Sequence, residues 1–358
     1  MSTKQEKIAN FDPSQPGLAD ASIYGLPFSA EESEIIIVSV PWEVTVSYGA
    51  GASEGPEAIM DASFQVDLLH QEFPELWKLG IYLDEGPAHW KANSNLYKEM
   101  AQPIIDALEK GEDIEENLEL KADLDKINQA CEVLNLELKK RVTSWINKGK
   151  KVILLGGDHS TPYGYYQALA SVHSSFGILH FDAHMDLRIA YEGFTYSHAS
   201  IMYNAIQLPE VSRLVQIGIR DFCEQEVQVV KSSDKVKVFT DADLKKGQFE
   251  GKTWKEQIEE AIELLPDNVA VSFDIDALYQ WYCPNTGTPV PGGLSYEQAV
   301  YALSCLAESN KNIIGMDLVE VAPGEDEWDG NVGARLLFHM CGVLAKNNGL
   351  PVGAKVIF

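Results

Sequence analysis

The sequence has few basic residues for its acidic content, and this shortage argues against one broad class of partners. Its 358 residues include 28 Lys and Arg against 54 Asp and Glu, which gives a formal net charge of −26. Binding to nucleic acid depends on Lys and Arg that neutralise phosphates, so we expect no nucleic-acid partner. We expect most of the charge to lie on a solvated acidic surface, and a cationic ligand is electrostatically compatible with it.

Long apolar runs, clustered cysteines and flexible linkers are also missing. No apolar run approaches the roughly 20 residues that cross a bilayer, so we expect no membrane partner. The polar N-terminus lacks the apolar core of a signal peptide, and the five cysteines are odd in number and scattered, so we expect a cytoplasmic protein. Without linkers or repeats, we predict an N-terminal arm over residues 1–32 and a single α/β domain over residues 33–358.

Short apolar runs alternate with helical lengths along most of the chain. Ile35–Val40 is the first convincing strand, and a glycine-rich loop follows it at 48–59. We predict further strands at 152–155, 177–181, 214–218, 236–239, 269–273 and 313–317. Apolar strands separated by helices are typical of a parallel sheet covered on both faces. We therefore predict a three-layer α/β/α fold with a mainly parallel sheet, and an added amphipathic helical segment around 84–150.

Three clusters of aspartate and histidine follow predicted strands, at residues 156–160, 181–186 and 272–276. Successive strand residues alternate faces, so residues 182, 184 and 186 project to one side, as do residues 274 and 276. Sites in parallel sheets lie beyond the carboxyl ends of the strands, where all three clusters fall. We therefore predict that six donors converge: His159, Asp182, His184, Asp186, Asp274 and Asp276.

Four aspartates and two histidines suit two metal ions held close together, because carboxylates can bridge while each imidazole serves one ion. Manganese, iron and nickel accept such mixed ligands, whereas structural zinc more often recruits cysteine. A single aspartate at a strand end is more often a cap or turn former, but three such motifs in series favour the metal site. Asp158 has a turn or orienting role, and His180 is expected to face away from the ligands.

The chain resembles the ureohydrolases, the family of arginase and agmatinase, whose members hydrolyse amidino groups at a binuclear manganese or nickel centre. The resemblance runs from about Ile35 to the C-terminus and rests on the loop at 51–59, the three clusters and the stretches at 286–294 and 317–323. It implies the arginase-like version of the fold, two divalent ions per chain (Mn²⁺ or Ni²⁺) and a homo-oligomer, either a trimer or a hexamer. It also implies how the donors divide: His159 and Asp186 on one ion, His184 and Asp276 on the other, and Asp182 and Asp274 shared.

The resemblance further implies the catalytic residues, which are His198, Glu320 and Asp186. His198 stands where the family's proton-shuttling histidine lies, and an imidazole suits protonation of a leaving amine; the alternative is a loop histidine bonded to backbone. Glu320 is the expected substrate anchor, because a carboxylate accepts two parallel N–H groups of a guanidinium; the alternative is a solvent-facing residue. Asp186 is counted both as a ligand and as a catalytic residue.

The loop after Asp276 departs from the agmatinase pattern, because residues 277–285 carry three large aromatic side chains. If this loop covers the metals, Trp281 and Tyr282 bind the substrate and fill the space of a long tail, which favours free guanidine. Alternatively, these aromatics pack in the core or a subunit interface. Arg188 resembles an arginine of formimidoylglutamases and could meet a substrate carboxylate, or it pairs with a surface acid.

The sequence thus predicts a binuclear-metal amidinohydrolase that converts a small guanidino compound, free guanidine or agmatine-like, to urea plus ammonia or an amine. One alternative is formimidoylglutamase-type hydrolysis of formiminoglutamate. His198 disfavours that alternative, because formimidoylglutamases typically lack a histidine there. The other is a non-catalytic ligand-binding homologue, which the six retained donors disfavour.

Overall fold

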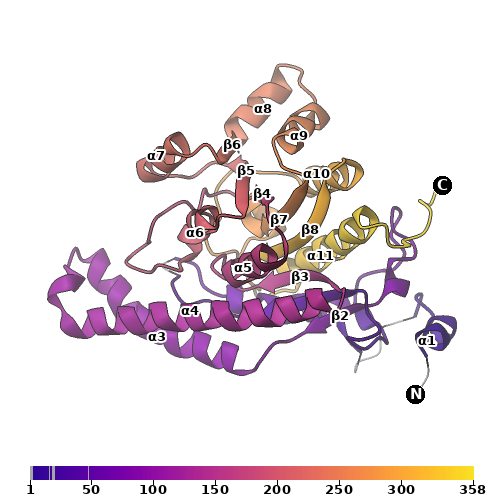
Figure 1. The fold of residues 1–358 in the computed structure, drawn as a ribbon, viewed down its shortest axis with the longest axis horizontal. Helices are drawn as coiled ribbons and strands as arrows, with labels where there is room; N and C mark the ends of the chain where they lie inside the picture. Colours follow the sequence, from indigo (N-terminus) through magenta and orange to yellow (C-terminus); the bar gives the residue numbers. More distant parts are fainter. Residues whose placement is uncertain (1–2, 16, 18–20, 47) are drawn as a thin grey trace.

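The computed structural model describes residues 3–15, 17, 21–46 and 48–358. Within these ranges, eight strands form one sheet in the order β2-β1-β3-β8-β7-β4-β5-β6, and every pairing is parallel. Figure 1 shows the twisted sheet with helices on both sides. The predicted three-layer α/β/α fold is confirmed.

The observed strands include one that the sequence did not predict. They are β1 (Ile35–Val40), β2 (Ile81–Asp84), β3 (Lys151–Gly156), β4 (Phe176–Phe181), β5 (Val211–Ile219), β6 (Val236–Thr240), β7 (Asn268–Asp274) and β8 (Asn312–Val319). β2 is the missed strand. It has four residues and pairs only with β1 at the sheet edge, so its conformation depends on a distant partner rather than on its own pattern.

Alternate residues of the strands pack into two separate cores. Ile35 and Ile37 of β1 belong to one core, and Ile36 and Val38 to the other. The first core is covered by α2 (Gly55–Ser63), α8 (Asp241–Phe249), α9 (Trp254–Glu263), α10 (Tyr296–Glu308) and α11 (Trp328–Asn347). The second is covered by α3 (His89–Glu109), α4 (Leu118–Asn147), α5 (Pro162–Val172), α6 (Ile201–Gln207) and α7 (Glu224–Ser232).

Helices α3 and α4 form a hairpin that corresponds to the predicted helical segment. Its tip extends beyond the sheet at the lower left of Figure 1, while α4 packs against α5 and α3. Cys131, Leu134 and Leu138 of α4 are buried at three- and four-residue spacing, as the amphipathic pattern predicts. Gly149, with φ of 78°, adopts a left-handed conformation just after α4.

Part of the N-terminal segment joins the core. α1 (Lys4–Asn10) contains no buried residue, but Ile23, Leu26 and Phe28 are buried with the first core. The division into an arm at 1–32 and one domain at 33–358 stays a prediction.

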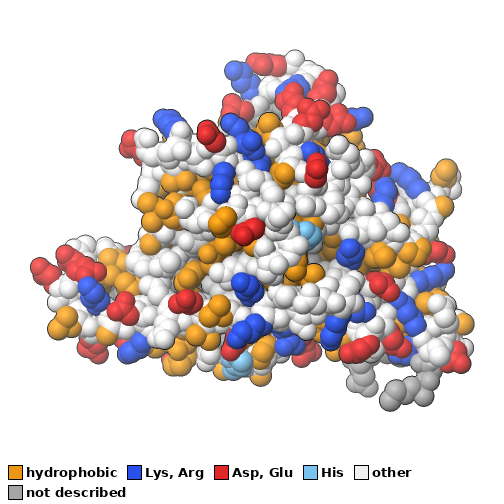
Figure 2. Space-filling model, viewed as in Figure 1, with side chains coloured by type: hydrophobic (Ala, Val, Ile, Leu, Met, Phe, Trp, Pro, Cys, Tyr) orange, Lys and Arg blue, Asp and Glu red, His pale blue; other side chains and the backbone are white. Residues whose placement is uncertain are grey.

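On the face drawn in Figure 2, acidic side chains gather over α8 and α9 and are mixed with basic ones elsewhere. All five cysteines are free thiols. No helix of the described part is long and apolar enough to cross a membrane.

Candidate active site

The predicted donors follow strands that are neighbours in the middle of the sheet. His159 lies beyond β3, the 182–186 segment lies beyond β4, and Asp274 ends β7. Because β3, β8, β7 and β4 are adjacent and parallel, their carboxyl ends meet at one place. The fold brings all six predicted donors to that place, where they form two groups.

The first group surrounds His159, which is 1% exposed. Its Nδ1 lies 3.0 Å from Asp182 Oδ2 and 3.0 Å from Asp186 Oδ2. Asp274 Oδ2 lies 3.2 Å from the same nitrogen. Three carboxylate oxygens and one imidazole nitrogen therefore converge on a single point.

The second group surrounds His184 and shares Asp182 with the first. His184 Nδ1 lies 3.4 Å from Asp182 Oδ1 and 3.1 Å from Asp276 Oδ2. The two oxygens of Asp182 therefore face different groups. This is the geometry of a carboxylate that can bridge two ions.

Two buried donor atoms without hydrogen-bond partners indicate whether metal ions fit this arrangement. His159 Nδ1 and Asp276 Oδ2 are buried and have no hydrogen-bond partner among the described residues, although carboxylate or imidazole atoms surround both. Buried polar atoms are rarely left unpaired, and atoms that converge without directed hydrogen bonds suit a shared cation. Two divalent ions would also neutralise the four carboxylates. The donor set therefore fits two divalent metals.

A row of buried polar side chains crosses four strands beneath the donors. Gln216, His180, Ser272 and Asp317 stand in register on β5, β4, β7 and β8. Ser272 Oγ donates to Asp317 Oδ1 at 2.8 Å, so it accepts from His159 Nε2 at 3.0 Å. This bond holds a proton of His159 on Nε2 and leaves Nδ1 as the atom that faces the carboxylates. Burial would lower the pKa of His159, but Asp182, Asp186 and Asp274 outweigh it and raise this pKa well above its usual range, so a metal ion would take the place of a proton on Nδ1. This row was not predicted from the sequence, although a polar residue inside an apolar strand is a visible signal.

The expectation that His180 faces away from the ligands is wrong. Residues 180 and 182 are two apart, so the pleat places them on the same side. Gln216 Nε2 donates to His180 Nδ1 at 2.9 Å, which leaves the proton of His180 on Nε2, 2.8 Å from Asp182 Oδ2. His180 thus orients Asp182 as a hydrogen-bond donor.

Asp158 has the turn role that was one of its two expected roles. Its Oδ1 accepts from the backbone N–H and from the hydroxyl of Ser160, at 2.9 Å and 2.5 Å. The side chain is buried, and this burial raises its pKa to about 6.

The concentration of carboxylates changes the protonation of the site. Burial and the charge of Asp182 raise the pKa of Asp186 to about 7. Burial alone would lower the pKa of His184, but Asp276 and Asp182 outweigh it and raise this pKa to about 12. Protons held so firmly mark a strongly negative field, which is what bound divalent cations would neutralise.

Glu320 follows β8 and is held in a strained conformation at the edge of the site. Its φ is 64°, in the left-handed region that non-glycine residues seldom adopt. Its Oε1 accepts from His159 N at 2.7 Å, and its carbonyl oxygen accepts from Thr286 Oγ1 at 2.9 Å. Burial and the nearby charge of Asp158 raise the pKa of Glu320 well above its usual range. Asp186 shares the unusual backbone, with φ of 54°.

A cavity of about 430 Å³ opens onto the donors and contains two further predicted residues. His184, Asp186 and His198 line it, together with Arg188. The remaining lining residues are Tyr48, Tyr191, Ala199, Asp221, Phe222, Cys223, Glu226 and Thr288. Burial and the charge of His184 lower the pKa of His198 to about 4. A histidine that binds a metal is neutral, so the charge of His184 lowers the pKa of His198 only in the metal-free site.

The side chain of Arg188 is free to meet a ligand in this cavity. Its guanidinium lies 4.7 Å above the ring of Tyr191 and forms no ion pair with an acidic side chain of the described residues. The alternative that Arg188 pairs with a surface carboxylate is therefore not observed among the described residues.

Trp281 and Tyr282 do not line the cavity. Trp281 is 62% exposed and stacks on Tyr279, with 4.4 Å between the ring centroids. Tyr282 packs against the first core. The loop is tied to α11, because Trp328 Nε1 donates to Trp281 O at 2.8 Å. Their proposed substrate contact stays a prediction that this cavity does not support.

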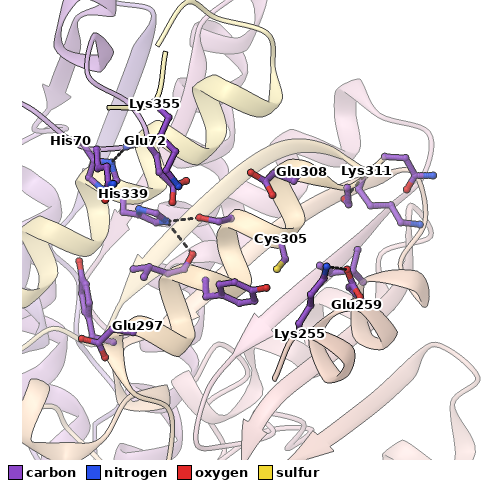
Figure 3. Close-up of a pocket in the computed structure, with 18 of the residues that line it drawn as sticks. His70, Glu72, Lys255, Glu259, Glu297, Cys305, Glu308, Lys311, His339 and Lys355 are labelled. Carbon is purple, nitrogen blue, oxygen red and sulfur yellow. Dashed lines mark hydrogen bonds and ion pairs between the residues drawn. The ribbon is translucent and has the colours of Figure 1, made fainter. Parts of the chain in front are cut away.

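A larger groove of about 1090 Å³ lies among α9, α10 and α11 (Figure 3) and contains none of the predicted site residues. Two of its polar groups have partners: His339 Nε2 lies 3.1 Å from Val300 O, and Lys255 pairs with Glu259 at 3.6 Å. Within the described chain, the acidic and histidine side chains that cluster closely enough for a metal lie at the donor groups, not here. The smaller cavity is therefore the candidate active site.

Comparisons with known proteins agree with this geometry. The family model described as the arginase family matches residues 33–342. An N(1)-aminopropylagmatine ureohydrolase of Thermus thermophilus is 30% identical over 323 residues, which cover 90% of this chain and 93% of that protein. An agmatinase of Halalkalibacterium halodurans is 27% identical over 83% of this chain and 86% of its own.

A solved structure with a similar fold is the agmatine ureohydrolase of Thermoplasma volcanium. Its TM-score is 0.68 at 23% identity, and the match covers 96% of this chain and 98% of that one. At this identity the likeness supports the fold alone. The matched family model and the Thermus relative carry the assignment, and the prediction of a hydrolase of the ureohydrolase class is confirmed. The chain belongs to the arginase family.

Proposed function

We propose that this chain is a binuclear-metal amidinohydrolase that releases urea from a small guanidino compound, free guanidine or agmatine-like. The observation that carries the proposal is the pair of donor groups that share Asp182, in which His159 Nδ1 and Asp276 Oδ2 meet other donor atoms without a hydrogen bond. Relatives named agmatinase and N(1)-aminopropylagmatine ureohydrolase support a guanidino substrate.

In this proposal the cofactors are two divalent ions, Mn²⁺ or Ni²⁺. The donors divide as follows: His159 and Asp186 on one ion, His184 and Asp276 on the other, and Asp182 and Asp274 shared. When bound, the ions supply Lewis acidity and lower the pKa of a water molecule for attack on the amidino carbon. Ser272 and His180 hold the ligands in the required orientation.

Glu320 and His198 act on the substrate itself. Glu320 Oε1 is occupied by His159 N, which leaves Oε2 to accept from the guanidinium; a methyl group built on Gly287 would lie 3.5 Å from this oxygen. Glu320 is buried and is not among the residues that line the cavity, so its contact with the substrate rests on the proposal. His198 lines the cavity beside His184 and Asp186, from where its imidazole can give a proton to the departing nitrogen.

Formimidoylglutamase-type hydrolysis is the second candidate, and Arg188 is the observation that favours it. An unpaired guanidinium in the cavity attracts a substrate carboxylate and repels the terminal ammonium of agmatine. Asp221 lines the same cavity and has the opposite preference. The charge of the substrate tail therefore decides between the candidates.

A substrate panel tests the proposal. Purified protein loaded with Mn²⁺ or Ni²⁺ is assayed with guanidine, agmatine, 4-guanidinobutyrate, arginine and formiminoglutamate, and urea, ammonia and formamide are measured. We expect urea from at least one guanidino compound, and loss of this activity in Asp182→Ala. Formamide from formiminoglutamate alone would overturn the guanidino assignment, and Arg188→Met should then raise KM for that substrate.

We also propose that the chain assembles as a homo-oligomer, a trimer or a hexamer, and works in the cytoplasm. The exposed aromatic side chains of Trp281 and Trp328 are compatible with the interface alternative for that loop. Sedimentation of the metal-loaded protein as a monomer at micromolar concentration would contradict the assembly.

A further inference from the structure

The glycine-rich loop at residues 48–55 forms part of the wall of the candidate active site. Tyr48 lines the cavity, and Gly49 N donates to Gly287 O at 3.1 Å. At Gly55 a methyl group would come within 2.0 Å of Val321 O. The loop thus packs directly against the segments that flank Glu320, and its first residue, Tyr48, reaches the cavity.

A buried carboxylate holds the backbone of this loop. Glu43 is 1% exposed, and its Oε1 accepts from Gly51 N at 2.7 Å and from Ala52 N at 3.2 Å. Its Oε2 accepts from Ser53 Oγ at 3.3 Å. Gly51 has φ of 131°, so the loop adopts a turn that most residues avoid. Hydrogen bonds that the loop donates to a carboxylate hold it there.

Helix α3 supplies the partners of Glu43 and of the loop. Lys98 Nζ donates to Glu43 Oε2 at 2.7 Å, and Glu43 N donates to Ser94 Oγ at 2.8 Å. Lys91 Nζ donates to Ser53 O at 3.0 Å. Residues 91, 94 and 98 share one face of the helix. The hairpin therefore holds the loop through side chains of a single helix.

The charge of Lys98 is needed at this position. A buried carboxylate is stable only when it is paired and hydrogen-bonded, and among the described residues Lys98 is the cation that contacts Glu43. Its side chain is 34% exposed, so replacing it removes the charge without opening a large internal cavity. The pair can therefore be broken with little change to the core.

We propose that Glu43 is a positioning residue of the active site and that α3, through Lys98, keeps it in place. Glu43 does not touch the substrate in this account. It fixes residues 51–53, and these keep the cavity wall in the conformation that binds substrate. The role assigned to α3 is thus to support the loop that borders the site.

Hydrogen exchange of the full-length protein tests this directly, and it does not depend on any activity. In Lys98→Met and in Glu43→Gln, we expect amides of residues 49–54 to exchange about tenfold faster or more, as loss of hydrogen bonds to a charged acceptor implies. Lys98→Arg keeps the charge and should retain most of the protection. Lys126→Met, which removes an exposed pair with Asp123 on α4, is the matched control and should match the wild type.

A second readout rests on the proposed function. On whichever guanidino compound the wild type hydrolyses, Lys98→Met should raise KM about tenfold with a smaller change in kcat, because only a fraction of molecules then hold a binding-competent loop. If the wild type has no hydrolase activity, the proposed function is refuted. The hydrogen-exchange experiment still tests the positioning role of Glu43 in that case.

Two outcomes would overturn the positioning role. One is exchange at residues 49–54 in Lys98→Met and Glu43→Gln that equals that of Lys126→Met. The other is faster exchange spread evenly over all strands, which would show a general loss of stability instead of a local loosening.

Discussion

The Ser272 hydroxyl holds a proton on Nε2 of His159, a proposed metal ligand, so its removal should weaken metal binding while leaving every proposed ligand in place. Ser272 accepts from His159 Nε2 at 3.0 Å and donates to Asp317 at 2.8 Å. In Ser272→Ala, the N–H of His159 loses its partner inside a fully buried part of the sheet. The imidazole proton is then free to move to Nδ1, the nitrogen that must face the metal.

The magnitude follows from the burial of these groups. A buried donor left without a partner costs about 1–3 kcal/mol, which corresponds to about 5- to 150-fold in an equilibrium constant. Loss of a partner behind a metal ligand typically lowers affinity about 10- to 100-fold. Tyr166 donates to Asp317 at 2.9 Å and the substitution does not remove this donor, so we expect the larger effect to fall on His159. We expect a 10- to 100-fold loss of affinity for one ion.

Competition with a chromophoric chelator measures the affinity for Mn²⁺ and Ni²⁺. Ser63→Ala is the matched control, because Ser63 is equally buried and its hydroxyl accepts from Tyr24 N and donates to Met60 O. That hydroxyl lies on α2 and contacts none of the predicted donors. Both variants should lose stability in excess chelator, but only Ser272→Ala should bind metal more weakly.

If folded Ser272→Ala binds metal as tightly as the wild type, then Ser272 does not orient His159 Nδ1 toward a metal ion. Equal losses of affinity in the two variants would refute this role as well, because the effect would then follow general destabilisation.

Three further predictions concern catalysis, the metals and a distant ion pair. His198→Asn should lower kcat by about 10²- to 10⁴-fold with unchanged metal content, because it removes the proposed proton donor; unchanged kcat in a steady-state assay would exclude that role. Chelation should lower the thermal unfolding midpoint in calorimetry, since ions at a hundredfold excess over Kd stabilise by about 2.7 kcal/mol, and Asp182→Ala should abolish the difference. Burial would raise the pKa of Asp84, but hydrogen bonds from Arg141 and Trp145 outweigh it and lower this pKa below the ordinary 3.8. The pair should therefore stabilise the fold above pH 3.8 and lose this effect as the pH falls through the lowered value; urea unfolding of Asp84→Asn and wild type should converge in acid, and a gap that persists there would contradict the assignment.

The convergence of the six donors could be predicted because it depends on short-range regularities. Parallel strands bring their carboxyl ends together, and each cluster follows such an end directly in sequence. The alternation of strand residues does not itself place the donors, because β4 ends at Phe181 and Asp276 lies in a short 3-10 helix. The first inference needs no knowledge of a distant contact. Strand β2 shows the opposite case, because four residues become a strand only by pairing with β1.

The remaining residues that line the cavity could not be predicted, because, like β2, they are positioned by contacts with segments distant in sequence. Trp281 and Tyr282 follow Asp276 closely in sequence, yet the tie from Trp328 on α11 and the stack on Tyr279 hold the loop away from the cavity lining. Adjacency to a ligand in sequence was a poor guide, because the direction of a loop depends on the elements that it contacts.

The polar row depends on the register of the sheet, so it cannot be predicted from each strand taken separately. Inside an apolar strand, a lone Ser272 or Gln216 suggests a tolerated polar residue, since each has no partner on its own strand. Only the pairing of β5, β4, β7 and β8 places these residues side by side with His180 and Asp317. A buried polar group is costly unless it is paired, so four such residues on neighbouring strands imply one another. Polar residues at matching depths in successive buried strands therefore predict a hydrogen-bonded row, and a row that ends beneath strand-end ligands predicts which atoms of those ligands face the metal.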